Sequence, residues 1–207
     1  AHLITQQYNA ALEEAMGLGI SGSKQKDILT SERLLHWHSI LLKDLHSEAG
    51  LIRSKTVRAG NTVFCRPKDI CNELDKFCQA LTNLQQRLHL GDSVSGNTPT
   101  TATNAWHAIL FAAVAMYGIV DIHPFADGNG RISRIVANWA LKAFPFTINL
   151  FATPAQRAEY VLTLEATRHL LSLSNQKKLH GAVTSNEILQ VTKSSGIFAP
   201  LVRLLMD

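Results

Sequence analysis

Residues 103–120, TNAWHAILFAAVAMYGIV, are almost wholly apolar and rich in alanine. Eighteen residues are far more than the roughly five or six of an ordinary β-strand. A helix without a polar face must be buried on all sides. No apolar run in the chain approaches the ~20 residues needed to span a bilayer without polar interruption. We therefore expect a central helix in a protein core, with no membrane span.

Most of the remaining chain shows the apolar periodicity of helices that would cover such a core. Thr30 or Ser31 could cap the first of these helices, because both carry a side-chain oxygen. The sequence therefore predicts an all-α fold. The predicted helices are 30–46, 67–88, 131–143, 154–173 and one that starts near Ser185, where SNEILQVT has a capping pattern.

One short segment departs from the helical pattern. Residues 56–64, TVRAGNTVF, place β-forming residues on both sides of Ala-Gly-Asn, which predicts a β-hairpin with a tight turn. Residues 90–101 are rich in Gly, Ser, Thr and Pro, and residues 17–27 are similarly polar and flexible. Both are predicted to be loops.

Composition narrows the classes of function. The 207 residues suit one domain with a small extension, and the net charge of +4 without clustered Lys or Arg argues against nucleic acid as a partner. Cys65, Cys71 and Cys78 form no CxxC pair, so no zinc site is expected and a reducing compartment is favoured. We expect a cytoplasmic protein, and delivery into another cell is compatible with this. The first residues do not resemble a signal peptide, and the missing Met fits the cut edge of a longer protein.

The sequence HPFADGNGRISR, residues 123–134, concentrates polar and flexible residues between two apolar runs. We expect the preceding helix to end near Val120 or Asp121 and a new helix to begin after Gly130. The start of a helix offers unpaired backbone N–H groups and a partial positive charge. Gly128 and Gly130 would let a ligand approach the backbone closely. These features predict an anion site suited to phosphate.

The charged side chains of this segment suggest phosphoryl or nucleotidyl transfer to a hydroxyl. Arg131 and Arg134 lie three residues apart, so they would share a helix face and extend the positive field toward a di- or triphosphate. Asp127 makes sense beside phosphates if it holds Mg²⁺. His123 is the candidate for proton transfer. The alternative for each residue alone is an ordinary turn and a structural histidine.

The whole segment resembles the signature of the Fic (filamentation induced by cAMP) family, His-x-Phe-x-(Asp/Glu)-Gly-Asn-Gly-Arg-x-x-Arg, at every fixed position. The resemblance extends from about residue 30 to 170. It implies a Fic-type helical bundle that transfers AMP from ATP to a Ser, Thr or Tyr hydroxyl of a target protein. It also implies roles for the following residues: His123 as general base, Asp127 as Mg²⁺ ligand, Gly128, Asn129 and Gly130 in the phosphate-binding loop, Arg131 and Arg134 on the distal phosphates, and Phe125 as the buried anchor of the loop.

The predicted hairpin matches the position of the family's flap, whose edge could pair with a target segment by β-augmentation. Val57, Thr62 and Val63 are the candidate docking residues, and a plain structural hairpin is the alternative. Just before the flap, the family usually has Gly-x-aromatic-Arg, whereas this chain has GLIR with Ile52 in the aromatic position. The packing under the flap is therefore left open by the sequence.

Many family members carry an inhibitory helix with the pattern (Ser/Thr)-x-x-x-Glu-(Gly/Asn), whose Glu pairs with the second Arg of the signature. No Glu of this chain is followed by Gly or Asn. Either a separate protein inhibits the enzyme, or the segment has been cut away, or inhibition of this kind is absent. Residues 5–16 could form a diverged version through Glu13 or Glu14, or a plain packing helix.

We therefore divide the chain into an N-terminal helix and loop (1–29), a catalytic core (30–175) and a C-terminal helical extension (176–207). The intact Gly-Asn-Gly favours AMP transfer over phosphorylation or phosphocholine transfer. Removal of AMP from a target, other phosphoryl transfer at the same site, and a non-catalytic ATP-dependent interaction module stay as alternatives. The sequence does not indicate the oligomeric state.

Overall fold

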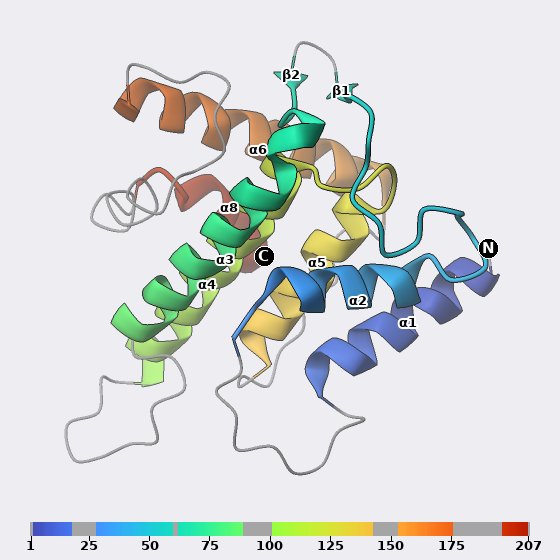
Figure 1. Cartoon of the computed structure of the whole chain (residues 1–207). Coiled ribbons are helices and arrows are strands. Elements are labelled where there is room, and N and C mark those ends of the chain that lie inside the picture. The colour runs from blue at the N-terminus through green and yellow to red at the C-terminus, as the bar shows by residue number, and fades with distance from the viewer. Residues whose placement is uncertain are drawn as a thin grey trace.

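The computed structural model describes residues 2–17, 28–59, 62–88, 101–142, 153–175 and 196–206. Helices dominate these residues, and a single short hairpin lies at one end of the bundle (Figure 1). The predicted all-α class with one β-hairpin is therefore confirmed. The α-helices are α1 (His2–Met16), α2 (Ser31–Leu41), α3 (Ile70–Arg87), α4 (Thr101–Ile122), α5 (Asn129–Leu141), α6 (Pro154–Asn175) and α8 (Ala199–Met206).

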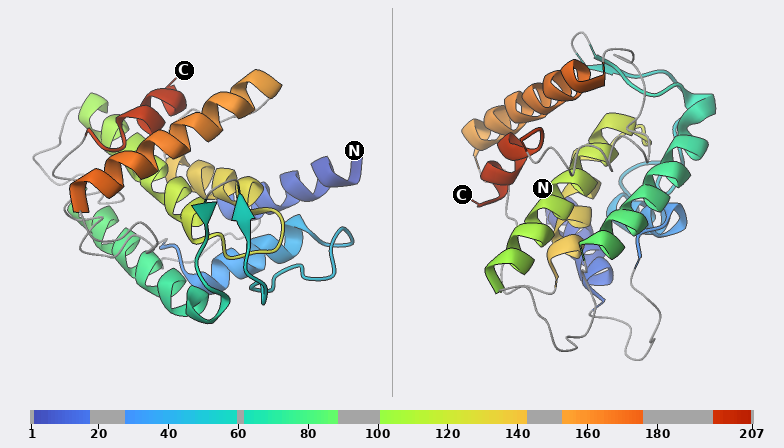
Figure 2. Two further views of the ribbon diagram at one scale, coloured as in Figure 1. Left: turned by 90° about the horizontal axis from the view of Figure 1, so that it is seen from above. Right: turned by 90° about the vertical axis from the view of Figure 1, so that its left-hand side faces the viewer.

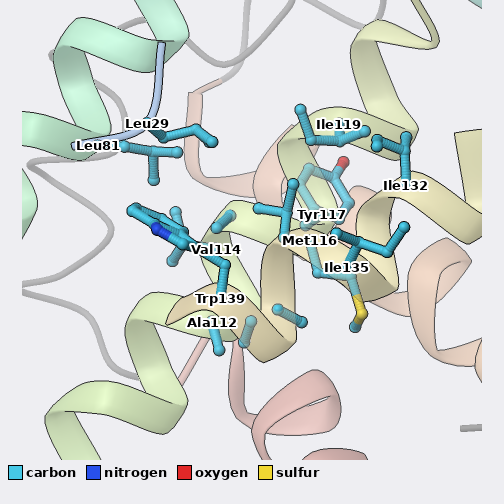
Figure 3. Close-up of a cluster of buried hydrophobic side chains, with 14 of the residues drawn as sticks. Leu29, Leu81, Ala112, Val114, Met116, Tyr117, Ile119, Ile132, Ile135 and Trp139 are labelled. Atoms are coloured by element: carbon cyan, nitrogen blue, oxygen red, sulfur yellow. The ribbon is translucent and has the colours of Figure 1, made fainter. Parts of the chain in front are cut away.

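Helices α4 and α5 form the centre of the core, as the apolar run predicted. Side chains of the two helices meet in one cluster, where Met116 and Ile119 of α4 lie near Ile132 and Ile135 of α5 (Figure 3). Helix α3 approaches α4 closely at Gly118, where an added Cβ would lie 2.1 Å from two atoms of the Phe77 ring. An 18-residue window of α4 has a mean hydropathy of 1.7, enough by composition to cross a bilayer, but 72% of it is buried within the protein. Such burial is expected of a core helix.

Helices α1 and α2 cover one side of α5. Thr30 caps α2, since its hydroxyl oxygen accepts a 3.3 Å hydrogen bond from the Arg33 N–H. The predicted helix over 30–46 is too long, because α2 ends at Leu41. Turns follow, and Asp44 adopts a left-handed backbone with φ of 60°, which a continuing right-handed helix cannot accommodate.

The predicted hairpin over 56–64 is present but short. Strands β1 (Arg58–Ala59) and β2 (Thr62–Val63) pair antiparallel, with Arg58 opposite Val63. The Phe64 N–H extends the ladder by donating to the Val57 carbonyl at 3.2 Å. The hairpin lies where α4 ends and α5 begins, on the side covered by α6 (Figures 1 and 2).

At the chain's C-terminal end, α8 packs against both α6 and α4. The 3₁₀ turn Pro67–Asp69 precedes α3, so the segment predicted as one helix over 67–88 begins with a tighter turn. The helix predicted near Ser185 and most of the two predicted loops, 17–27 and 90–101, lie outside the described residues.

Candidate active site

The candidate site is built where the chain turns from α4 into α5. Helix α5 begins at Asn129, and Gly128 precedes it with a left-handed φ of 82°. The helix therefore starts earlier than the sequence predicted, which was after Gly130. Gly128 makes the early start feasible, because glycine adopts this φ without steric cost. The expected helix N-terminus beside the Gly-Asn-Gly segment is present.

Asn129 fixes the loop from within. Its side-chain oxygen accepts from the Phe125 N–H at 3.1 Å, and its side-chain nitrogen donates to the Phe125 carbonyl at 2.8 Å. Asn129 is buried, and Phe125 is fully buried as the predicted anchor. The two hydrogen bonds close a ring that holds the backbone of Phe125 in one conformation. In this structure the Asn129 side chain is directed to the loop backbone, so its observed role is structural.

His38 of α2 clamps the same loop from outside. Its ring stacks on Phe125 with centroids 3.7 Å apart and an angle of 8° between the planes. The Gly50 N–H donates to Nδ1 at 3.0 Å, so a neutral ring carries its proton on Nε2 and donates it to the Asp127 carbonyl at 3.0 Å. Burial lowers the pKa of His38, which keeps the ring neutral. His38 therefore packs in the core and also orients the loop.

His123 has the geometry of a base. Its Nδ1 lies 3.3 Å from the Val120 carbonyl, which can only accept, so the neutral ring places its proton on Nδ1 and leaves the Nε2 lone pair available. Its backbone is left-handed, with φ of 54°. The ring stacks on Phe64, just after β2, with centroids 4.0 Å apart. Burial, together with the charges of Arg53 and Arg168, lowers the pKa of His123, so the ring is a neutral proton acceptor at neutral pH.

Arg53, the Arg of the GLIR sequence, links this base to the flap. It is almost fully buried. Its Nε donates to the His123 carbonyl at 2.7 Å, while its two terminal nitrogens donate to the carbonyls of Lys55 and Cys65 at 2.6 Å each. The two flanks of the hairpin and the start of the loop are thereby tied to one guanidinium. Ile52 stands in the aromatic position and packs, partly buried, against the hydrophobic core.

Asp127 is the candidate metal ligand. Its carboxylate accepts from the Gly128 N–H at 2.6 Å and from Arg131 at 2.7 Å, and the side chain is 60% exposed. Partial burial alone would raise the pKa of Asp127, but these two partners lower it below its usual value, so the group is ionised. No cluster of three or more metal-binding side chains occurs among the described residues. A Mg²⁺ ion held by one carboxylate and by substrate phosphates fits this donor set.

Arg134, the second arginine of the signature, contacts helix α1. Its guanidinium lies over the ring of Tyr8 in α1, 5.8 Å from the centroid. Of the two candidate inhibitory residues, Glu14 has its carboxylate 3.5 Å from His36 of α2. Helix α1 reaches the second arginine of the signature with the ring of Tyr8.

Of the three predicted docking residues, Val63 is the exposed one, Val57 and Thr62 being partly covered. Thr62 faces the Arg168 guanidinium of α6, with 3.4 Å between Oγ1 and Nη1. His38, Arg53 and Arg168 are site residues for which the sequence indicated no role. The place of Arg53 in the GLIR sequence was a signal that could have identified it. Nothing in the sequence around Arg168 indicated a contact with the flap.

The sequence of the chain is similar to sequences of known proteins. The sequence model of the Fic/DOC family matches residues 28–141, more than half of the chain. The chain is 28% identical to "Protein adenylyltransferase Fic" of Drosophila mojavensis over 73% of its length, and 30% identical to the protein of that name from Nematostella vectensis over 72%. It spans about a quarter to a third of these relatives, 26% and 32%.

The fold agrees with a solved structure as well. A Fic domain-containing signalling protein from Bacteroides thetaiotaomicron superimposes with a TM-score of 0.64 at 20% identity, covering 99% of this chain and 70% of that one. At this identity the likeness concerns the fold alone. The signature segment lies inside the matched residues. In the structure it forms the anchored loop and the start of α5, and the flap lies next to it. The chain belongs to the Fic/DOC family.

Proposed function

We propose that this protein is a protein adenylyltransferase, which moves AMP from ATP to a Ser, Thr or Tyr hydroxyl of a target protein. The observation that carries the proposal is the placement of the His123 ring between the Val120 carbonyl and Phe64. Its Nδ1 is occupied by the Val120 carbonyl, and its lowered pKa keeps Nε2 unprotonated. A site that only binds ATP has no need for a base held in this way. The names of the relatives support the same activity.

In the proposed reaction, His123 Nε2 accepts the proton of the target hydroxyl as the oxygen attacks the α-phosphorus. A new bond forms between this oxygen and phosphorus, and the bond from the α-phosphorus to the bridging oxygen breaks, so pyrophosphate leaves. The backbone N–H groups at the start of α5 stabilise the charge that develops on the phosphate oxygens. Arg131 and Arg134 bind the departing phosphates, for which both must release their present contacts with Asp127 and Tyr8.

Mg²⁺ is the proposed cofactor, with Asp127 as its protein ligand. When bound, the ion would neutralise charge on the phosphates. The ionised and exposed carboxylate of Asp127 is suited to this role. Arg131, which now pairs with this carboxylate, would be the neighbouring group for the nucleotide phosphates.

The flap is the proposed docking surface for the target. Val57, Thr62 and Val63 lie in or beside its two strands, and an extended target segment could add to the free edge. Because His123 stacks on Phe64 at the base of the flap, a docked segment would pass close to the base. Holding the hydroxyl there would supply much of the rate enhancement by proximity.

The test uses α-³²P-ATP and Mg²⁺ with the proteins of a bacterial and a eukaryotic lysate as acceptors. We expect label on protein with the wild-type chain and none with His123→Ala. The matched control is His36→Ala, which removes a mostly exposed histidine of α2 and should label normally. Label from γ-³²P-ATP would indicate a kinase instead. ATP binding without any covalent product would indicate a non-catalytic module.

A further inference from the structure

Arg168 of α6, which is not part of the family signature, contacts both the last turn of α4 and the flap. It lies beyond residues 28–141, the part matched by the family model. Its Nε and Nη2 donate to Asp121 Oδ1 at 3.1 and 3.0 Å, two residues before His123. The remaining terminal nitrogen, Nη1, lies 3.4 Å from Thr62 Oγ1 in β2, a long hydrogen bond.

The guanidinium also reaches the residue that contacts the base. Its central carbon lies 6.0 Å from the centroid of the Phe64 ring, and the other partner of Phe64 is the stacked ring of His123. Arg168 therefore meets the flap at two positions, Thr62 and Phe64. A cation over an aromatic ring contributes about 0.5–1 kcal/mol at an exposed site and more where water is excluded.

On the side away from the flap, Arg168 is held by Asp121. Asp121 Oδ1 accepts from Arg168 and also from the Tyr117 hydroxyl at 3.3 Å. The Arg168 and Asp121 side chains are only 26% and 16% exposed, so the ion pair is poorly screened by solvent. Because Asp121 lies in the last turn of α4, the guanidinium is fixed relative to the segment that carries the base.

We propose that Arg168 is a positioning residue that sets the distance between the flap and His123, so that a docked target presents its hydroxyl to the base. The inference rests on the proposed AMP transfer for its catalytic consequence, and on geometry alone for the placement of the flap. A guanidinium is suited to this role because its planar fork can hold a carboxylate on one side and the hydroxyl of Thr62 on the other.

The planar shape of the guanidinium also suggests a variant that separates the ion pair from the contacts with the flap. In Arg168→Lys, one ammonium can keep the ion pair with Asp121 but cannot occupy the positions of Nε, Nη2 and Nη1 together. We expect Arg168→Lys to retain a near wild-type thermal midpoint while releasing the flap. Arg168→Gln removes both the ion pair with Asp121 and the cationic contacts with the flap. Arg203→Lys, an exposed position on α8, is the matched control.

The first measurement is hydrogen exchange of the full chain, followed at the amide of Phe64. Exchange should be at least about tenfold faster in Arg168→Lys and Arg168→Gln, with no change in Arg203→Lys, because the protecting Phe64-to-Val57 bond opens more often. Wild-type exchange in both Arg168 variants would overturn the proposal. This measurement decides the placement even if the chain shows no AMP transfer.

The second measurement compares two acceptors of AMP from α-³²P-ATP: lysate proteins and water, the latter seen as free labelled AMP. Water needs the base but not the flap. We expect Arg168→Lys to lower protein labelling at least about tenfold and AMP release by a much smaller factor. Equal losses of both activities, or full labelling by Arg168→Lys, would contradict a positioning role. If the wild type releases no AMP and labels nothing, the proposed function fails, and the hydrogen exchange still judges Arg168.

Discussion

Replacing His38 with Phe tests whether the clamp on the signature loop stabilises the fold as the structure indicates. The Phe ring can keep the stack on Phe125, whose centroid lies 3.7 Å from that of His38. It loses both hydrogen bonds, from the Gly50 N–H and to the Asp127 carbonyl. His38 is 1% exposed, and its replacement leaves two partly buried backbone groups without their partner.

The size of the effect follows from these two bonds. Leaving a buried donor or acceptor unpaired costs about 1–3 kcal/mol. Both backbone groups are only partly buried and can recruit water, so about 1 kcal/mol for each, or about 2 kcal/mol in all, is the reasonable figure. For a domain of this length, about 2–4 °C is lost per kcal/mol, which gives a thermal midpoint lowered by about 4–8 °C. His38→Ala would also lose the stack and leave a cavity, raising the cost to about 3–5 kcal/mol.

The pH dependence of stability gives an independent readout. Burial lowers the pKa of His38 in the folded state, so the unfolded chain takes up its proton first as the pH falls. The stability associated with neutral His38 is thus complete above about pH 6.5 and is lost as the pH falls below it. His38→Phe should show a shallower decline between pH 7 and 5, although His123 continues to contribute to it.

Circular dichroism melts of the wild type, His38→Phe and His36→Phe at several pH values measure both effects. His36 is two residues away on the same helix, but its side chain is 57% exposed, so His36→Phe should change stability by less than about 0.5 kcal/mol. A wild-type midpoint for His38→Phe at pH 7.5 would refute the structural reasoning. So would an unchanged slope with pH.

Two further predictions concern the base and the core. Labelling by the wild type should stay level from pH 8 to about 6.5 and fall only below it, because burial, Arg53 and Arg168 lower the pKa of His123; a pH–rate profile with its acid limb centred above 6.5 would contradict this. Gly118→Ala should cost about 1–3 kcal/mol or more in urea unfolding, because the new Cβ would lie 2.1 Å from atoms of the Phe77 ring. Gly196→Ala is its control, because an added Cβ there has no neighbour within 4 Å, and equal stability of the two variants would argue against the close packing of α3 on α4.

The sequence was sufficient for the elements whose pattern is local. The apolar run at 103–120 became α4, and the signature residues came together because they are consecutive in the chain. Errors occurred where one backbone angle decides the outcome. Helix α2 stops at Leu41 before the left-handed Asp44, and α5 starts at Asn129 because Gly128 is left-handed. Hydrophobic periodicity does not report such angles.

Contacts between distant residues were the part that no local pattern could supply. His38 meets Asp127 across 89 positions, and Arg168 meets Thr62 across 106. Spacing correctly placed Arg131 and Arg134 on one helix, but it could not predict that Tyr8 of a distant helix would lie against the Arg134 guanidinium. Side-chain direction depends on what the tertiary fold places opposite each residue.

These distant contacts explain how one short loop keeps two titratable groups deprotonated for different purposes. Burial and the nearby Arg53 and Arg168 charges disfavour the imidazolium of His123, so it stays neutral and basic. Asp127 is more exposed and is paired with Arg131, so it stays ionised and anionic. Positive charge thus lowers both pKa values, yet it leaves one group neutral and the other anionic. A chain that lost Arg53 or Arg168 would retain the whole signature and still lose part of what keeps its histidine a base.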